Sequence, residues 1–160
     1  MAVDMFLKID DVKGESYDDK HKGEIDVLSF SWGMTQSASA HVGGGSGAGK
    51  VNVHDLSITK YVDKSSPTLM LATCTGKAYK EATLVVRKAG EKPLEYIKLT
   101  MKDVLISSLS TGGSGGEDRL VENMSLNFGE YKMEYVPQKP DGSGDAAQTA
   151  SYSMKLNKKI

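Results

Sequence analysis

Apolar and polar residues alternate along most of this chain, which is the period of a half-buried β-strand. In the first such stretch, residues 2–9, one face carries Val3, Met5, Leu7 and Ile9. Further alternating stretches cover residues 25–35, 51–62, 82–87, 94–108, 120–136 and 152–156. The pattern predicts seven or eight strands.

One stretch, residues 65–76, carries helix signals instead. Ser66 can cap its amino end, Pro67 suits the first turn, and Gly76 suits the position after the last turn. Cys74 is expected to pack in the core as a small apolar residue. One helix among many strands, without a strand–helix–strand rhythm, predicts a mainly β protein. The fold is then an antiparallel barrel or sandwich with one short flanking α-helix.

The second predicted strand has two unlike faces. Its core side is expected to carry Leu28, Phe30 and Trp32, while Ser29 and Ser31 lie on the opposite face. Small hydroxyl side chains make a flat, open and polar surface. Taken alone, this is the pattern of an ordinary solvent-facing surface.

The alternation changes phase at two points. It slips near His54-Asp55, which predicts a β-bulge in the stretch 51–62. It also reverses at Gly129, where a glycine within the long strand expected over residues 120–136 predicts a bulge or a bend. Both points are therefore expected to redirect side chains rather than end the sheet.

The stretch from Gly44 to Lys50 resembles a phosphate-binding loop, Gly-x-x-x-x-Gly-Lys-[Ser/Thr]. In such a loop the closing hydroxyl ligates magnesium, and a helix follows whose first N–H groups face the phosphate. Val51 occupies the hydroxyl position here, and the residues after it alternate like a strand. A P-loop nucleotide-binding enzyme is therefore an alternative that two departures from the motif argue against.

Residues 112–116 match Gly-x-Ser-x-Gly, the pattern of a nucleophile elbow. That elbow needs a strand–turn–helix setting and, in its usual chain order, a histidine after the serine. His54 is the last histidine of the chain. The segment is therefore interpreted as a flexible connection, and no catalytic residue is predicted.

Composition and charge narrow the function further. The 160 residues amount to about one ordinary domain, and a net charge of −1 gives no electrostatic basis for binding nucleic acid or a lipid membrane. Cys74 is the only cysteine, and His21, His41 and His54 are interpreted as ordinary solvated or half-buried side chains without metal-ligand spacing. No metal or cofactor is predicted. The first residues lack the continuous apolar segment of a signal peptide.

Long strands have edges, and an uncovered edge pairs with other chains. Closed cyclic symmetry is the usual way in which copies of a soluble chain satisfy such edges. Together with the two glycine-rich connections, the long strands favour an assembly protein over an enzyme.

Several short segments follow one another in a characteristic order. Among them are Phe30-Ser31-Trp32-Gly33-Met34, Gly43 to Lys50, Asp63-Lys64-Ser65-Ser66-Pro67, Arg87-Lys88-Ala89-Gly90, Ser110 to Arg119 and Leu126-Asn127-Phe128. In this order they resemble the hemolysin-coregulated protein (Hcp) family, the tube protein of bacterial type VI secretion. The resemblance covers essentially the whole chain and is weakest from Ala146 onward.

The resemblance implies a single Hcp-like tube domain over residues 1–160, folded as an antiparallel β-barrel with one flanking helix. It implies hexameric rings that stack into a tube, with sheath and spike components and effector proteins as further partners. It also implies a bacterial cytoplasmic protein that is secreted through the type VI system without a signal peptide. An alternative is the tube protein of a related phage-tail-like contractile injection device.

The resemblance also indicates candidate site residues. Ser31 matches the family's second strand and is expected to face the ring lumen, with Ser29 beside it, so both are candidate effector-binding residues. The family's long loop toward neighbouring subunits or the next ring matches Gly43, Gly44, Gly45, Ser46, Gly47, Ala48 and Gly49. A second candidate assembly loop consists of Gly112, Gly113, Ser114, Gly115 and Gly116.

Overall fold

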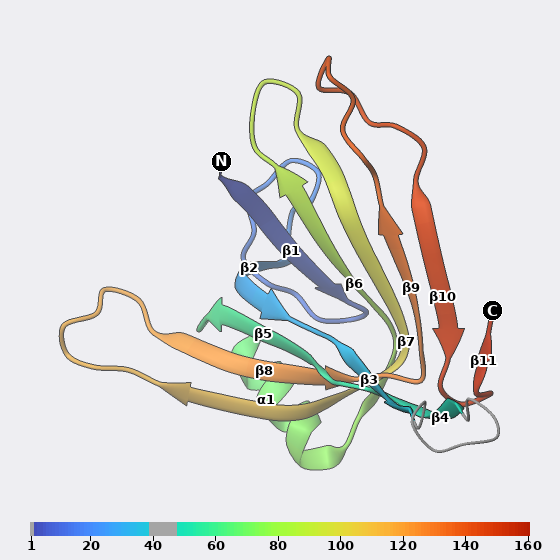
Figure 1. Ribbon diagram of the computed structural model, residues 1–160. Coiled ribbons are helices and arrows are strands. Elements are labelled where there is room, and N and C mark those ends of the chain that lie inside the picture. Colours follow the sequence, from blue (N-terminus) through green and yellow to red (C-terminus); the bar gives the residue numbers. More distant parts are fainter. Residues whose placement is uncertain (1, 39–47) are drawn as a thin grey trace.

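The computed structural model describes residues 2–38 and 48–160 (Figure 1). The described residues form one helix, α1 (Ser66–Thr75), and eleven strands. The strands are β1 (Val3–Ile9), β2 (Ile25–Ser31), β3 (Met34–Ala38), β4 (Ala48–Val53), β5 (Leu56–Tyr61), β6 (Ala78–Lys88), β7 (Leu94–Gly112), β8 (Val121–Asn127), β9 (Glu130–Tyr135), β10 (Gln148–Ser153) and β11 (Lys158–Lys159).

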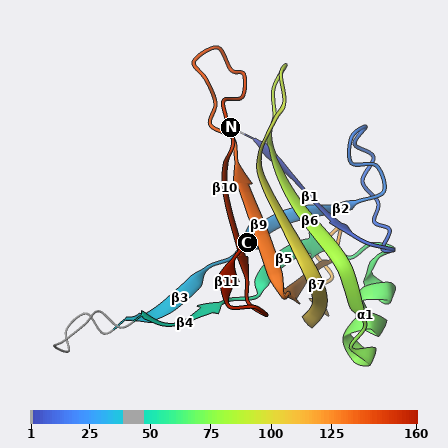
Figure 2. The same cartoon turned by 90° about the vertical axis from the view of Figure 1, so that its right-hand side faces the viewer.

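Six strands close into an antiparallel barrel in the order β7-β6-β1-β2-β5-β8, and the pairing of β8 with β7 completes the circle. From β7 the sheet extends outward through β9, β10 and β11, while β3 and β4 form a separate two-stranded ribbon. Figure 2 shows this ribbon projecting to the left, away from β6 and β7. The predicted mainly β fold with one flanking helix is confirmed, and the barrel is the correct alternative.

β7 belongs to both parts of the sheet. Its first half pairs with β6 on one side and β9 on the other, and its last residues pair with β8. β8 and β9 therefore run in line along β7, with Gly129 at the break between them. The Gly129 N–H donates to the carbonyl of Lys102 at 2.9 Å. The predicted change of phase at Gly129 is confirmed, because Phe128 before it and Tyr131 after it both face the core. The single strand expected over residues 120–136 is wrong, since β8 and β9 are separate strands.

The barrel interior holds the apolar residues that the strand period places inward. Each of the following is at most 1% exposed: Leu7, Ile25, Leu56, Ile58, Leu84, Leu99, Met101 and Leu126. α1 packs against β7 and buries Leu69 and Ala72. Gly76 ends the helix in the left-handed conformation, at φ 68°, as predicted. The short helix is therefore held by packing on the barrel.

Two details of the helix prediction are wrong. Ser65 is the N-cap residue, while Ser66 lies buried in the first turn. Cys74 is exposed, because only Ser66, Leu69 and Ala72 of the helix turn toward the barrel. A capping residue and an apolar side chain do not by themselves define which face of so short a helix packs against the barrel.

The prediction that Leu28 faces the core is also wrong, since this residue is 40% exposed. The pairing of β2 with β5 shifts register between Val27 and Ser29, so Leu28 is the extra residue of a bulge. Before the bulge Val27 is buried, and after it Phe30 and Trp32 pack against the core as predicted. One inserted residue exchanges the two faces of the strand.

The glycine-rich segment after β2 connects the two strands of the ribbon, β3 and β4, which pair antiparallel. Residues 43–47 of the candidate assembly loop lie outside the described residues, while Ala48 and Gly49 begin β4. A strand therefore follows the loop, as expected, where a phosphate-binding loop requires a helix. The bulge expected near His54-Asp55 is instead a break, because β4 ends at Val53 and β5 starts a different sheet.

Two other predicted boundaries are corrected. β7 continues through the stretch expected to be loop and ends at Gly112, because β8 gives it a hydrogen-bonded partner that far. β10 ends at Ser153, and a turn with Asn157 at φ 52° leads into β11. Within the described ranges, no helix has the length and apolar character needed to cross a membrane.

Candidate functional site

Four consecutive barrel strands present hydroxyl and amide side chains on their outer side. In one row, register pairs Ser31 with Ser57, Ser57 with Ser125 and Ser125 with Ser108. In the next row, the paired residues are Ser29, Thr59, Asn123 and Ser110. These eight residues of β2, β5, β8 and β7 are termed the hydroxyl face. The sheet therefore places six further polar residues, on β5, β8 and β7, beside the two predicted serines.

The strand period explains why this surface is polar on one side only. Ile58 and Met124, which alternate with the polar residues of β5 and β8, are buried in the barrel. Ser29 and Ser31 are exposed, as are most of their neighbours on the hydroxyl face. Side chains of this kind donate and accept hydrogen bonds without carrying a formal charge.

Hydrogen bonds between strands hold parts of the hydroxyl face in place. The Thr59 hydroxyl donates to Asn123 Oδ1 at 2.8 Å. The hydroxyl of Ser125 pairs with that of Ser108 at 2.5 Å and with that of Ser107 at 2.7 Å. The centre of the face is thus partly ordered, while Ser29 and Ser31 lie at its β2 side.

The extended part of the sheet presents a contrasting, charged surface. Lys98, Lys102, Glu130, Lys132 and Glu134 line one hollow over β7 and β9. Lys102 lies 3.7 Å from Glu130, and Lys132 lies 3.5 Å from Glu134. Lys102 and Glu130 face each other across β7 and β9, where opposite charges stabilise a sheet, whereas Lys132 and Glu134 both lie on β9. The barrel strands and the extension therefore offer two chemically different surfaces.

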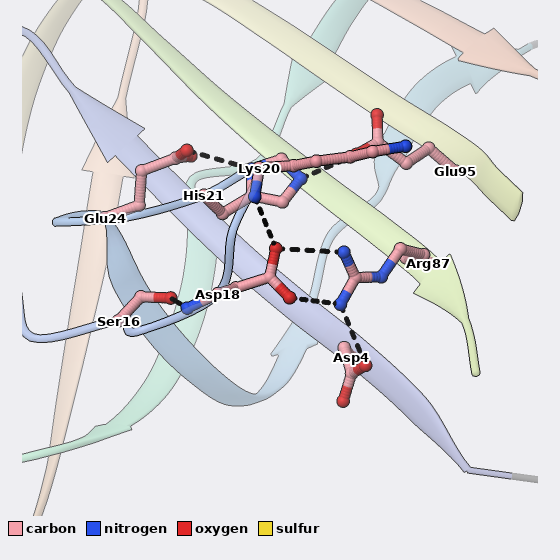
Figure 3. Close-up of polar contacts among 8 residues, drawn as sticks. All are labelled: Asp4, Ser16, Asp18, Lys20, His21, Glu24, Arg87 and Glu95. Atoms are coloured by element: carbon pink, nitrogen blue, oxygen red, sulfur yellow. Dashed lines mark hydrogen bonds and ion pairs between the residues drawn. The ribbon is translucent and has the colours of Figure 1, made fainter. Parts of the chain in front are cut away.

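The loop between β1 and β2 folds over the outer side of β1 and β6 through a polar cluster (Figure 3). The His21 ring stacks on Phe6 with a centroid distance of 4.3 Å. Its Nδ1 lies 2.9 Å from Glu24 Oε2, and its Nε2 lies 2.6 Å from Glu95 Oε1. His21 is 7% exposed, so the interpretation of this residue as solvated or half-buried is wrong. The partner on β7 is 74 residues away, and no local pattern could have indicated it.

Arg87 forms the second half of this cluster. Its two terminal nitrogens donate to the two carboxylate oxygens of Asp18 at 3.0 and 2.6 Å, and one of them also donates to Asp4 at 3.2 Å. These hydrogen bonds lower the pKa of Asp18 to about 2 and raise the pKa of Arg87. The ion pair therefore fastens the loop to β6 while the carboxylate is charged.

Acid is expected to remove this fastening. Because the pKa of Asp18 falls from 3.8 to about 2 on folding, its contribution is present above about pH 4 and is lost as the pH falls toward 2. Asp18→Asn should lower the free energy of unfolding by about 1 kcal/mol at neutral pH, after allowance for solvent screening. Urea unfolding at several pH values measures the difference, which should shrink toward pH 2. The exposed Asp19, changed to Asn, is the matched control; a pH-independent effect of Asp18→Asn contradicts the prediction.

The second candidate assembly loop lies beside the hydroxyl face. Gly112 ends β7, and residues 113–116 lead toward β8. A hollow at this end is lined by Ser110 and Asn123 of the hydroxyl face together with Gly113 and Ser114. The structure therefore places this loop beside the β7 and β8 part of the hydroxyl face, and β5 separates it from Ser29 and Ser31 on β2. The sequence did not indicate this arrangement.

Comparison with known proteins agrees with the family resemblance seen in the sequence. A profile of the family described as "Type VI secretion system effector, Hcp" matches residues 6–135. The protein hcp1 of Pseudomonas aeruginosa is 64% identical over 146 residues, which cover 91% of this chain and 90% of that protein. The crystal structure of Hcp1 from Salmonella typhimurium has 43% identity and a TM-score of 0.83, with 100% of both chains covered. A structure described as a type six secretion system protein has 32% identity and a TM-score of 0.94, over 99% of this chain and 100% of that one.

Proposed function

Because this chain belongs to the Hcp family of type VI secretion, we propose that it is a structural tube protein. Copies of the chain form a homohexameric ring, and rings stack into a tube that is exported from the bacterial cytoplasm. The lumen of the ring binds and protects effector proteins on the way. The role is mechanical and chaperone-like rather than enzymatic.

The observation that carries this proposal is the hydroxyl face. Eight neutral polar residues, joined by strand register, extend over four neighbouring strands. A lumen that receives different folded cargoes needs a wall whose hydrogen bonds can adapt and which repels neither positive nor negative surfaces. Hydroxyl groups meet both requirements, because they donate and accept hydrogen bonds and carry no formal charge. Ser29 and Ser31 are therefore assigned to the wall of the lumen.

The ribbon of β3 and β4 supports self-assembly. It leaves the barrel as a two-stranded sheet of its own, and an isolated two-stranded sheet is at best marginally stable in water. Its two outer edges present main-chain groups that a second copy can pair with. The candidate loop at residues 43–49, and the second loop at 112–116, are proposed to contact neighbouring subunits or the next ring.

The charged surface of the sheet extension suits the outside of the tube. Side chains such as Lys98, Lys102 and Glu134 line a hollow there, and charged side chains on a surface oppose unspecific hydrophobic association. We place this surface toward the sheath, with the spike at the end of the tube. The lumen is then lined by the neutral hydroxyl face, and the exterior carries the charged surface of the sheet extension.

Electron microscopy of the purified protein in negative stain tests the assembly. Rings with six-fold symmetry are the expected result. A protein that remains monomeric at high concentration contradicts the proposal. A tube protein of a related phage-tail-like injection device would form similar rings, so only the genes beside this one separate that alternative.

Enlarging one side chain of the hydroxyl face should weaken cargo binding. Ser31→Gln places a longer amide on the exposed position of β2, where it fills space that cargo would occupy, and we expect about a tenfold loss of co-purified effector with rings intact. Ser151→Gln on β10, outside the hydroxyl face, is the matched control. Equal amounts of effector bound to wild type and Ser31→Gln rings would refute the assignment of this residue.

The remaining alternative is a P-loop enzyme. Titration of the protein with a nucleoside triphosphate separates it from a tube protein, which should not bind the nucleotide. The strand β4 after the glycine-rich segment favours the tube protein.

A further inference from the structure

Two short connections join the ribbon of β3 and β4 to the barrel. Residues 32–33 link β2 to β3, and residues 54–55 link β4 to β5. The two connections run side by side, because the N–H of His54 donates to the carbonyl of Gly33 at 3.0 Å. Among the described residues, no strand ladder ties β3 or β4 to the barrel sheet. The direction of the ribbon therefore depends on side chains at the two connections and on Val53, the last residue of β4, which packs against the barrel core.

Trp32 links the first connection to both the second connection and the barrel. Its indole N–H donates to the carbonyl of His54 at 2.9 Å. Its ring meets Tyr131 edge-on, with centroids 4.9 Å apart at 76°, and lies 6.1 Å from the ring of Phe128. Aromatic pairs in this geometry are favourable beyond the area they bury. One side chain thus touches both connections and the corner between β8 and β9.

Asp55 anchors the second connection from the other side. One of its carboxylate oxygens accepts the Ser107 hydroxyl at 2.6 Å, and the other accepts the Asn127 amide at 2.8 Å. These partners belong to β7 and β8, so the second connection is held to two barrel strands. Hydrogen bonds to a charged acceptor are stronger than those between neutral groups.

The Tyr131 hydroxyl also reaches the ribbon itself. It lies 3.9 Å from the sulfur of Met34, the first residue of β3. Tyr131 therefore touches both Trp32 and the base of β3. Trp32, Asp55 and Tyr131 are termed the ribbon clamp.

We infer that the ribbon clamp positions β3 and β4 for pairing with a second copy of the chain. This inference rests on the proposed self-assembly. A segment already held in its bound direction loses less freedom on association, so a fixed ribbon binds more tightly than a loose one. The three residues act on assembly through the ribbon's direction, and Trp32 and Tyr131 also pack against the edge of the barrel core.

The test uses the fact that Trp32 is the only tryptophan of the chain. Its fluorescence therefore reports the clamp directly. Asp55→Ala and Tyr131→Leu each open the clamp while leaving Trp32 in place. We expect faster quenching of Trp32 by acrylamide and an association at least about tenfold weaker in sedimentation velocity. Tyr131→Phe keeps the ring against Trp32 and loses only the 3.9 Å hydroxyl contact with the Met34 sulfur, so it should stay close to wild type in both measurements.

The possible outcomes separate the inference from the proposed function. Faster quenching with unchanged association, or unchanged quenching in both variants, overturns the inference while leaving the ring proposal intact. A wild-type protein that does not associate overturns the proposed function, and the inference that rests on it fails with it. Far-ultraviolet circular dichroism confirms that each variant is folded. Should one variant not fold, the other still carries the test, since each acts on a different connection.

Discussion

Lys60→Met alone is expected to lower the free energy of unfolding by about 3–5 kcal/mol, because it leaves a buried carboxylate without its cation. Lys60 and Glu122 project into the barrel from neighbouring strands, and both side chains are 0% exposed. The lysine Nζ donates to Glu122 Oε1, to the carbonyl of Tyr61 at 3.0 Å and to the hydroxyl of Ser66 at 3.3 Å. It also lies 3.2 Å from Asp63 Oδ1, so the substitution affects two carboxylates. Chemical denaturation measures the loss.

A double variant separates the ion pair from simple packing. Lys60→Met combined with Glu122→Leu replaces the fully buried pair by apolar side chains, and such replacements are often neutral or stabilising. Asp63, the other carboxylate beside Lys60, keeps the hydrogen bonds that it accepts from the N–H and the hydroxyl of Ser65. We expect it to recover most of the stability that Lys60→Met loses. A double variant as unstable as the single one would mean that the methionine itself does not fit, and would contradict the explanation by an unpaired charge.

Gly14→Ala is expected to destabilise the protein by about 3 kcal/mol, the upper part of the range for overpacking. A Cβ at Gly14 would overlap the carbonyl oxygen of Glu24 and lie 2.8 Å from the Cα of Ile25. These are main-chain atoms, so no side-chain rotation relieves the contact. The N–H of Gly14 also donates to Gly23 at 2.8 Å, which holds the loop closed.

The same substitution should loosen the cluster at the outer side of β1. Displacing the loop separates Asp18 from Arg87 and His21 from Glu95 (Figure 3). Gly115→Ala is the matched control, since no described atom lies within 4 Å of its added Cβ. Urea unfolding of the two variants measures the effect, and equal midpoints for Gly14→Ala and wild type would refute it.

Only part of the hydroxyl face could be predicted from the local sequence pattern. A strand alternates its side chains by backbone geometry alone, so Ser29 and Ser31 could be assigned to one face from the sequence. Their neighbours Ser57 and Ser125 come from β5 and β8 through strand register. Register depends on contacts between distant segments, and no local pattern encodes it.

Period, glycines and turn residues were therefore enough to predict a mainly β protein with one helix, the change of phase at Gly129 and the strand after the glycine-rich loop. These features depend on neighbours along the chain. The closed barrel, the outward turn of Leu28 and Cys74, the burial of His21 and the Lys60–Glu122 pair depend on which segments pack together. Only the tertiary structure decides them, because burial and ion pairing are energies of contact between residues far apart in sequence.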